Sequence, residues 1–151
     1  MKRFLIALSV FFLIILLAFI LFKPFSFTTI SSSPVINEEK LWSLIQDWRV
    51  KNNLEPYIED QRLCDIAKKR APEIQNEIDS STTHSGFLTK FKNYPYKISE
   101  NVIAYAKDES DALNWWLSSS SHRKALEYSW SYSCVKCFNN FCSQIFSSFE
   151  P

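Results

Sequence analysis

The chain has 151 residues, with 17 Lys or Arg, 16 Asp or Glu and a formal net charge of +1. Three of the basic residues precede Pro24, so the chain from Pro24 onward carries 14 basic and 16 acidic residues, a formal charge of -2. The basic residues form no long run there, which excludes nucleic acid as a partner, because phosphate recognition needs a concentrated basic surface. About 120 residues suffice for one hydrophobic core and hardly for two, so we expect one domain.

An uncharged stretch of nineteen residues, 4–22, follows Met1-Lys2-Arg3 and is ended by Lys23. At a rise of about 1.5 Å per residue, such a helix matches a hydrocarbon core of about 30 Å. No Ala-x-Ala cleavage site follows it. We therefore expect residues 1–23 to form a retained single-pass membrane anchor, with the C-terminal domain extracytoplasmic. The alternatives are a cleaved signal, which would leave a secreted domain, and a lipid-attached form.

Residues 24–36 are rich in Ser, Thr, Phe and Pro and lack a helical period, so they are expected to link the anchor to a domain over 37–149. Asn37 is suited to cap a helix whose apolar residues recur at spacings of three and four, namely Leu41, Leu44, Ile45 and Trp48. Asn52-Asn53 ends this helix, and residues 54–57 form a connector.

A second helix is expected to start at Asp60, and Pro72 should kink or split it. Residues 79–99 show no clear period, so we expect mostly loop. A third helix begins near Asp108, which can cap it, and residues 102–105 suit a short strand. The Ser118 to Ser121 run is expected to be a solvated loop, because a serine nucleophile needs a positioned base and an oxyanion hole.

All four cysteines lie beyond the apolar stretch, in a compartment expected to be oxidising. Asn139-Asn140 tolerates the positive φ of a two-residue type I′ turn, which makes Cys137 and Cys142 a non-hydrogen-bonded strand pair. A disulfide fits that pair, and Cys134 is then left for Cys64. The alternative is a zinc site built from the Cys-x-x-Cys-x4-Cys spacing with a fourth ligand.

Glu100 and the two histidines, His84 and His122, are distinguished by their local sequences, because neither histidine belongs to a helical His-Glu-x-x-His motif. Four segments contain or follow them, in the order His84-Ser-Gly-Phe87, Ser99-Glu100-Asn-Val-Ile-Ala104, Trp116-Leu-Ser-Ser-Ser-Ser-His122-Arg123 and Cys142-Ser-Gln-Ile-Phe146. Their order and spacing resemble the bacterial CAP (SCP-like) superfamily, named for cysteine-rich secretory proteins, antigen 5 and pathogenesis-related protein 1. Residues 44–49, 54–56 and 63–71 resemble the family's first two helices, so the resemblance covers roughly 37–149.

The resemblance implies an α+β fold, a CAP-like α-β-α sandwich with a central antiparallel sheet, here preceded by one transmembrane helix. In the family, two histidines and two glutamates line an open cleft, and divalent metal has been found there in some members. Carried over by motif, the cleft residues are His84, Glu100 and His122. Ser119 stands where the second glutamate is expected, and Ser99 replaces a glycine that commonly precedes the first. The implied metal ligands are therefore His84, Glu100 and His122, with zinc or copper as candidate ions.

Two imidazoles and one carboxylate match the composition of open catalytic zinc sites. No general base is assigned once the second glutamate is missing, so we predict a non-enzymatic binding module for a divalent metal, a small ligand or an envelope component. The alternatives are a metal-dependent hydrolase of cell-envelope peptide or ester bonds and a structural adhesion domain whose three cleft side chains hydrogen-bond to one another. Lipid and protein partners stay open, since family members have been linked to sterol and fatty-acid binding.

Gly86 is the single glycine of the chain and follows His84 by two residues. We expect a positive φ or a close backbone approach there. Substitution by alanine should then perturb the loop more than the core.

Overall fold

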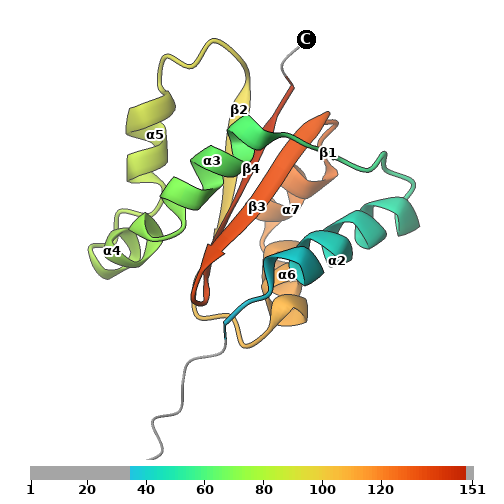
Figure 1. Cartoon of the computed structure of the whole chain (residues 1–151), viewed down its shortest axis with the longest axis horizontal. Coiled ribbons are helices and arrows are strands. Elements are labelled where there is room, and N and C mark those ends of the chain that lie inside the picture. Colours follow the sequence, from blue (N-terminus) through green and yellow to red (C-terminus); the bar gives the residue numbers. More distant parts are fainter. Residues whose placement is uncertain (1–34, 149–151) are drawn as a thin grey trace, which may run out of the picture. The chain divides into compact units, whose positions relative to one another are not determined.

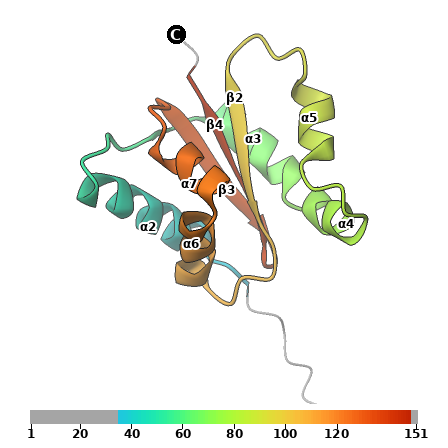
Figure 2. The same ribbon diagram turned by 180° about the vertical axis from the view of Figure 1, so that it is seen from behind.

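The computed structural model describes residues 35–148, shown from two sides in Figures 1 and 2. The expected membrane helix over 4–22 and nearly all of the expected linker lie outside these residues. Within 35–148, no helix is long and apolar enough to cross a membrane.

Three helices begin at the side-chain caps predicted from the sequence. Asn37 accepts a hydrogen bond from the backbone N–H of Lys40 at the start of α2 (Glu38–Lys51). Asp60 caps α3 (Gln61–Arg70), and Asp108 caps α6 (Glu109–Ser118). Each cap satisfies a backbone N–H that the first turn of a helix leaves without a partner, which is why local sequence is enough to locate these starts.

Pro72 splits the second predicted helix, since α3 ends at Arg70 and α4 (Glu73–Asp79) begins just after the proline. Two further helices correct the sequence prediction. α5 (Ser85–Phe91) lies in the segment expected to be mostly loop, and α7 (Ser120–Glu127) begins inside the serine run. Each short helix has one buried residue, Phe87 in α5 and Leu126 in α7, so neither shows a helical apolar period.

The sheet has four strands in the order β1-β3-β4-β2. They are β1 (Ile58–Glu59), β2 (Ile98–Ile103), β3 (Tyr132–Phe138) and β4 (Phe141–Ser147). β4 pairs antiparallel with both β2 and β3, whereas β1 pairs parallel with β3. The sheet is therefore mixed rather than wholly antiparallel, because the connector after α2 adds a two-residue edge strand.

The β3–β4 hairpin has the predicted register, with Cys137 opposite Cys142. Of the two turn residues only Asn139 has a positive φ, of 57°, so the turn is not the predicted type I′. A disulfide joins Cys137 to Cys142 across a Cα separation of 4.0 Å. The second disulfide joins Cys64 in α3 to Cys134 in β3. All four thiols are thus oxidised in pairs, so the zinc-thiolate alternative is wrong.

Helices cover both faces of the sheet, with α2, α6 and α7 on one face and α3, α4 and α5 on the other (Figures 1 and 2). The larger core lies under α2 and α6, around the fully buried Trp116 and Phe146. A smaller core lies under α3 and includes Leu63, Phe87 and Ile145. β2 forms one edge of the sheet, so side chains from both helical layers can meet around it.

Candidate functional site

The candidate site lies around edge strand β2, which projects neighbouring side chains to opposite faces of the sheet. The Glu100 carboxylate is fully buried on the face covered by α3. Asn101 points the other way, and its side-chain N–H donates to the backbone oxygen of His122 in α7 at 3.0 Å. This bond brings α7 and its histidine to the edge at which Glu100 sits.

Arg70, the last residue of α3, forms a two-point ion pair with Glu100. Its Nε lies 2.9 Å from Oε1 of Glu100 and its Nη2 lies 3.2 Å from Oε2. The same guanidinium binds Glu77 of α4 at 2.7 and 3.0 Å and Glu73 at 2.6 Å. One buried arginine of α3 therefore holds three carboxylates, two from α4 and one from β2.

The charges of this cluster stabilise one another. Burial alone would lower the pKa of Arg70, but its hydrogen bonds to Glu77 and Glu100 raise the pKa above its ordinary value. Burial likewise works to raise the pKa of Glu77, and the bonds from Arg70 outweigh it and hold the pKa below its ordinary value. Glu73 also pairs with Lys90 of α5.

Glu77 also fixes the backbone that carries His84. Its Oε2 accepts from the backbone N–H of His84 and its Oε1 from that of Gly86, both at 2.9 Å. His84 has a left-handed φ of 69° and stands at the N-terminus of α5. The expected close approach is found at Gly86, where an added Cβ would stand 2.5 Å from both Arg70 Nη1 and Glu77 Oε1, whereas the positive φ belongs to His84.

Within residues 35–148, the Glu100 carboxylate has four hydrogen-bonding contacts, which occupy its acceptor sites. Oε1 accepts from Arg70 and from the hydroxyl of Ser143 at 2.9 Å, and Oε2 accepts from Arg70 and faces Nδ1 of His84 at 3.0 Å. An ionised carboxylate can only accept, so this contact places the His84 proton on Nδ1. Nε2 of His84 then presents its lone pair away from Glu100.

His122 lies beside His84 with a ring-centroid separation of 6.1 Å. Its Nδ1 is buried and has no hydrogen-bond partner among the described residues. Burial lowers the pKa of His122 below its ordinary value, and the neighbouring His84 lowers it further. Buried side-chain nitrogens are nearly always paired, so this atom calls for a ligand or water.

His84 and Glu100 line an open pocket of about 310 Å³, together with Phe87, Leu88, Ile98 and Ser99. Within the described residues, the metal-ligating atoms of His84, Glu100 and His122 do not gather as a close group of three. The one close group there, Glu59 with Cys64 and Cys134, contains two disulfide sulfurs and cannot serve as a thiolate site. The structure thus joins His84 to Glu100 directly and sets His122 next to them.

Sequence reasoning missed Arg70, Glu77 and Ser143. Arg70 did carry a signal, because it falls on the same helical faces as the apolar Leu63 and Ala67, where a charged residue needs a buried partner. Ser143 occupies an inward position of β4 and gave no comparable signal.

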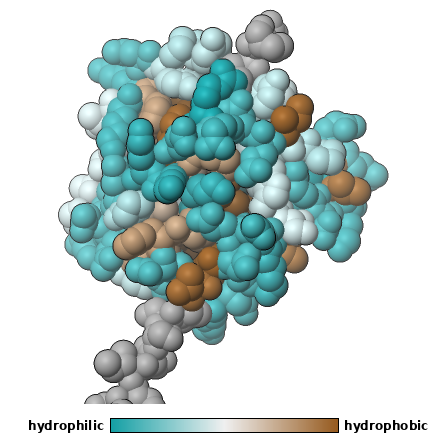
Figure 3. All heavy atoms as spheres, in the orientation of Figure 1, coloured by the Kyte–Doolittle hydropathy of each residue, from teal (hydrophilic) through white to brown (hydrophobic). Residues whose placement is uncertain are grey.

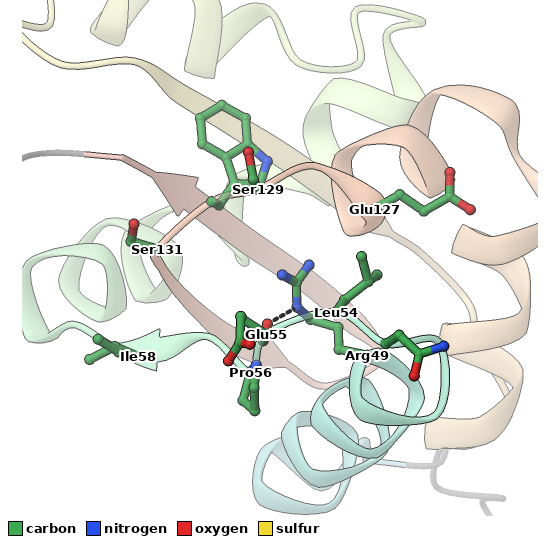
Figure 4. A pocket seen from close by; sticks show the side chains of 10 residues that line it. Arg49, Leu54, Glu55, Pro56, Ile58, Glu127, Ser129 and Ser131 are labelled. Carbon is green, nitrogen blue, oxygen red and sulfur yellow. Dashed lines mark hydrogen bonds between the residues drawn. The ribbon is translucent and has the colours of Figure 1, made fainter.

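A larger pocket of about 540 Å³ lies between the end of α2, the connector after it and the segment after α7 (Figure 4). Arg49 is fully buried there and donates to the backbone oxygens of Glu55 and Leu126 at 2.7 and 2.5 Å. Its guanidinium also stacks on Tyr57, 3.7 Å from the ring centroid. These contacts join α2 to α7, so a structural role explains why Arg49 is buried.

Residues 42–141 match the sequence profile of the cysteine-rich secretory protein (CAP) family. Among solved structures, the chain is similar to an extracellular protein containing an SCP domain from Bacillus anthracis, at 24% identity and a TM-score of 0.61, over 74% of this chain and 40% of that one. It is similar to a cysteine-rich secretory protein from Staphylococcus aureus at 22% identity and a TM-score of 0.58, over 74% of this chain and 38% of that one. An outer surface protein from Borrelia burgdorferi matches at 21% identity and a TM-score of 0.56, over 74% and 92% of the two chains.

The chain therefore covers well under half the length of the Bacillus and Staphylococcus proteins and most of the Borrelia protein. These identities show a shared fold. No curated protein matches the chain.

Proposed function

This chain belongs to the CAP family of cysteine-rich secretory proteins, and we propose that it is a binding module that receives a divalent metal ion or a small polar ligand between His84 and His122. The observation that carries the proposal is the buried Nδ1 of His122, which has no partner among the described residues and lies beside a second imidazole. Such an atom is stabilised by a cation or by a hydrogen-bond donor that enters from outside the domain.

In this proposal the two imidazoles bind the ligand, and Glu100 is not the metal ligand that the sequence predicts. Its carboxylate is saturated by Arg70, Ser143 and His84, so it would orient His84 rather than bind a metal itself. A carboxylate behind a ligating histidine fixes the tautomer and strengthens the nitrogen as a ligand. Two imidazole nitrogens suit zinc or copper, which would polarise a bound ligand, with water completing the coordination.

The charge balance of the cluster supports a cationic ligand. Arg70 and Lys90 supply two positive charges, and Glu73, Glu77 and Glu100 supply three negative ones. The cluster is therefore formally -1 when both histidines are neutral, a balance that attracts a cation.

The same contacts favour binding over hydrolysis. A metal-dependent hydrolase needs a carboxylate or another base that is free to take a proton from water. Glu73, Glu77 and Glu100 are each engaged by Arg70, and Ser119 stands at the N-terminus of α7 where a second family glutamate is expected. No candidate base remains among the carboxylates that surround His84.

We further propose that the domain lies outside the cytoplasm and is held to the membrane by residues 4–22. The two disulfides support an oxidising compartment. The Bacillus protein is described as extracellular and the Borrelia protein as an outer surface protein, which agrees with this location. The length and apolarity of residues 4–22 support the anchor.

Calorimetric titration of zinc and copper into the full chain in detergent tests the binding site. We expect saturable binding that is lost in the His84→Ala/His122→Ala variant, with an unchanged circular dichroism spectrum. Arg123→Ala, next to His122 but exposed, serves as the matched control and should bind like the unsubstituted chain. Equal binding by the double variant, or none by the unsubstituted chain, would contradict a metal site.

A further inference from the structure

Three large apolar side chains are exposed at one end of the domain. Val35 is 72% exposed, Tyr105 57% and Phe138 49%. We call these three residues the hairpin-end patch. Single exposed apolar residues are common on protein surfaces, but several around one turn indicate an interaction site.

Backbone contacts show that the patch is one feature. The N–H of Ile36, next to Val35, donates to the backbone oxygen of Asn139 at 3.2 Å, and the N–H of Tyr105 donates to that of Asn140 at 3.1 Å. All three side chains therefore surround the β3–β4 turn. In Figure 3, apolar atoms gather at the lower end of the domain, close to where the described chain begins.

The geometry of this end makes it rigid. Tyr105 packs its ring against Phe141 at a centroid distance of 5.0 Å, and Phe141 is the strand partner of Phe138. The Cys137–Cys142 disulfide closes the hairpin directly behind that pair. The patch can therefore bind a surface without first paying for the ordering of a flexible loop.

The apolar stretch 4–22, a short distance before Val35 in the sequence, indicates which surface the patch binds. Residues 23–34 separate the apolar stretch 4–22 from the patch, and twelve residues span at most about 40 Å. The connection enters the domain at the patch itself, so an anchor in the membrane would keep the patch at high local concentration near lipid. Aromatic residues, tyrosine especially, are favoured at the boundary between lipid and water.

We propose that the hairpin-end patch docks on the outer lipid surface of the membrane that holds residues 4–22. This rests on the anchor proposed above. Docking in this way also orients the candidate site. The hairpin turn lies at the Ile103 end of β2, whereas Ile98 and Glu100 of the His84 pocket lie toward the opposite end of that strand, so the pocket would open away from the lipid.

Photocrosslinking of the full chain in bacterial membrane vesicles tests the docking. A benzophenone side chain is placed at position 138 in one protein and at position 50 in the control, because Val50 is 57% exposed but lies near the C-terminal end of α2, away from the hairpin. We expect several-fold more adduct with lipid at position 138 than at position 50, read by mass spectrometry of the digested protein.

Three other outcomes would contradict the docking proposal, and they distinguish a failure of the docking from a failure of the anchor. Protein that resists extraction by alkaline carbonate but forms no excess of lipid adduct at position 138 would leave the anchor standing and refute the docking. A crosslinked species of twice the mass would assign the patch to a second copy of the chain. Release of the protein by carbonate would show that residues 4–22 do not anchor the chain, and the docking proposal, which rests on the anchor, would be refuted with it.

Discussion

Arg70 and Glu100 are 30 residues apart in the sequence and face each other in a two-point ion pair, with both side chains fully buried. Through this pair, the end of α3 determines where the strand carboxylate sits, and the carboxylate in turn determines which nitrogen of His84 carries a proton. The binding chemistry of His84 thus depends on a residue outside the pocket.

Replacing Arg70 by alanine should destabilise the domain strongly. The buried carboxylates of Glu77 and Glu100 would lose the arginine that pairs with them, and breaking a buried pair in this way costs about 3–5 kcal/mol. Urea denaturation monitored by circular dichroism measures the change. Arg123→Ala is the matched control, because its pair with Glu127 is exposed and should contribute less than about 0.5 kcal/mol. Similar losses in the two variants would mean that the cluster is not a buried network.

Gly86→Ala should destabilise the domain although alanine normally favours a helix over glycine by about 0.5–1 kcal/mol. The added methyl group would overlap the bonded atoms of Arg70 and Glu77, and such overpacking costs about 1–3 kcal/mol. Thermal unfolding compares this variant with Thr89→Ala, an exposed position in the same helix. A Gly86→Ala protein as stable as the control would show that the close approach is easily relieved.

Glu100→Gln should weaken metal binding without abolishing it. The glutamine keeps the size of the side chain but loses the charge that orients and polarises His84, and such changes behind a ligating histidine reduce affinity about 10–100-fold. Zinc titration at a temperature where the variant stays folded gives the affinity, with the exposed Glu127→Gln as control. Complete loss of binding, as expected for His84→Ala, would instead make Glu100 a direct ligand.

The sequence predicts those parts of the fold that depend on neighbouring residues. Asn37, Asp60 and Asp108 mark helix starts because a cap and the amide it satisfies lie within three residues of each other. The Asn139-Asn140 turn fixes the hairpin register, and with it the position of Cys137 opposite Cys142, for the same reason.

The candidate site is less predictable, because its central contacts join distant segments. Motif resemblance identified His84, Glu100 and His122, but nothing near Glu100 in the sequence indicates that Arg70 and Ser143 saturate it. α7 was missed because serine favours helix caps over helix interiors, so a serine run resembles a loop. The parallel pairing of β1 depends entirely on its distant partner in β3.

The two disulfides should contribute unequally to stability. The Cys64–Cys134 bond closes a loop of about 70 residues and the Cys137–Cys142 bond one of about five, so the chain-entropy estimates are about 4 and 2 kcal/mol. Unfolding of the Cys64→Ser/Cys134→Ser and Cys137→Ser/Cys142→Ser variants measures the difference, after peptide mapping has verified the remaining bond. A larger loss on removing the hairpin disulfide would show that the geometry of the hairpin outweighs loop closure.

Acidification from pH 7.5 to 5.5 should destabilise the folded chain partly through His122. Burial lowers the pKa of His122 in the folded state below the value of about 6.5 expected for an unfolded chain, so the unfolded state binds the proton more readily. Its contribution is therefore fully present above pH 6.5 and is lost as the pH falls through the folded-state pKa. The carboxylates Glu73 and Glu77, whose pKa values are lowered, lose their contribution only at more acidic pH.

Urea midpoints between pH 7.5 and 5.5 should fall less steeply in His122→Gln, which retains His84. Parallel pH profiles for the two proteins would mean that the His122 ring is hydrated when the domain is folded. Water would then be the hydrogen-bond partner of its Nδ1.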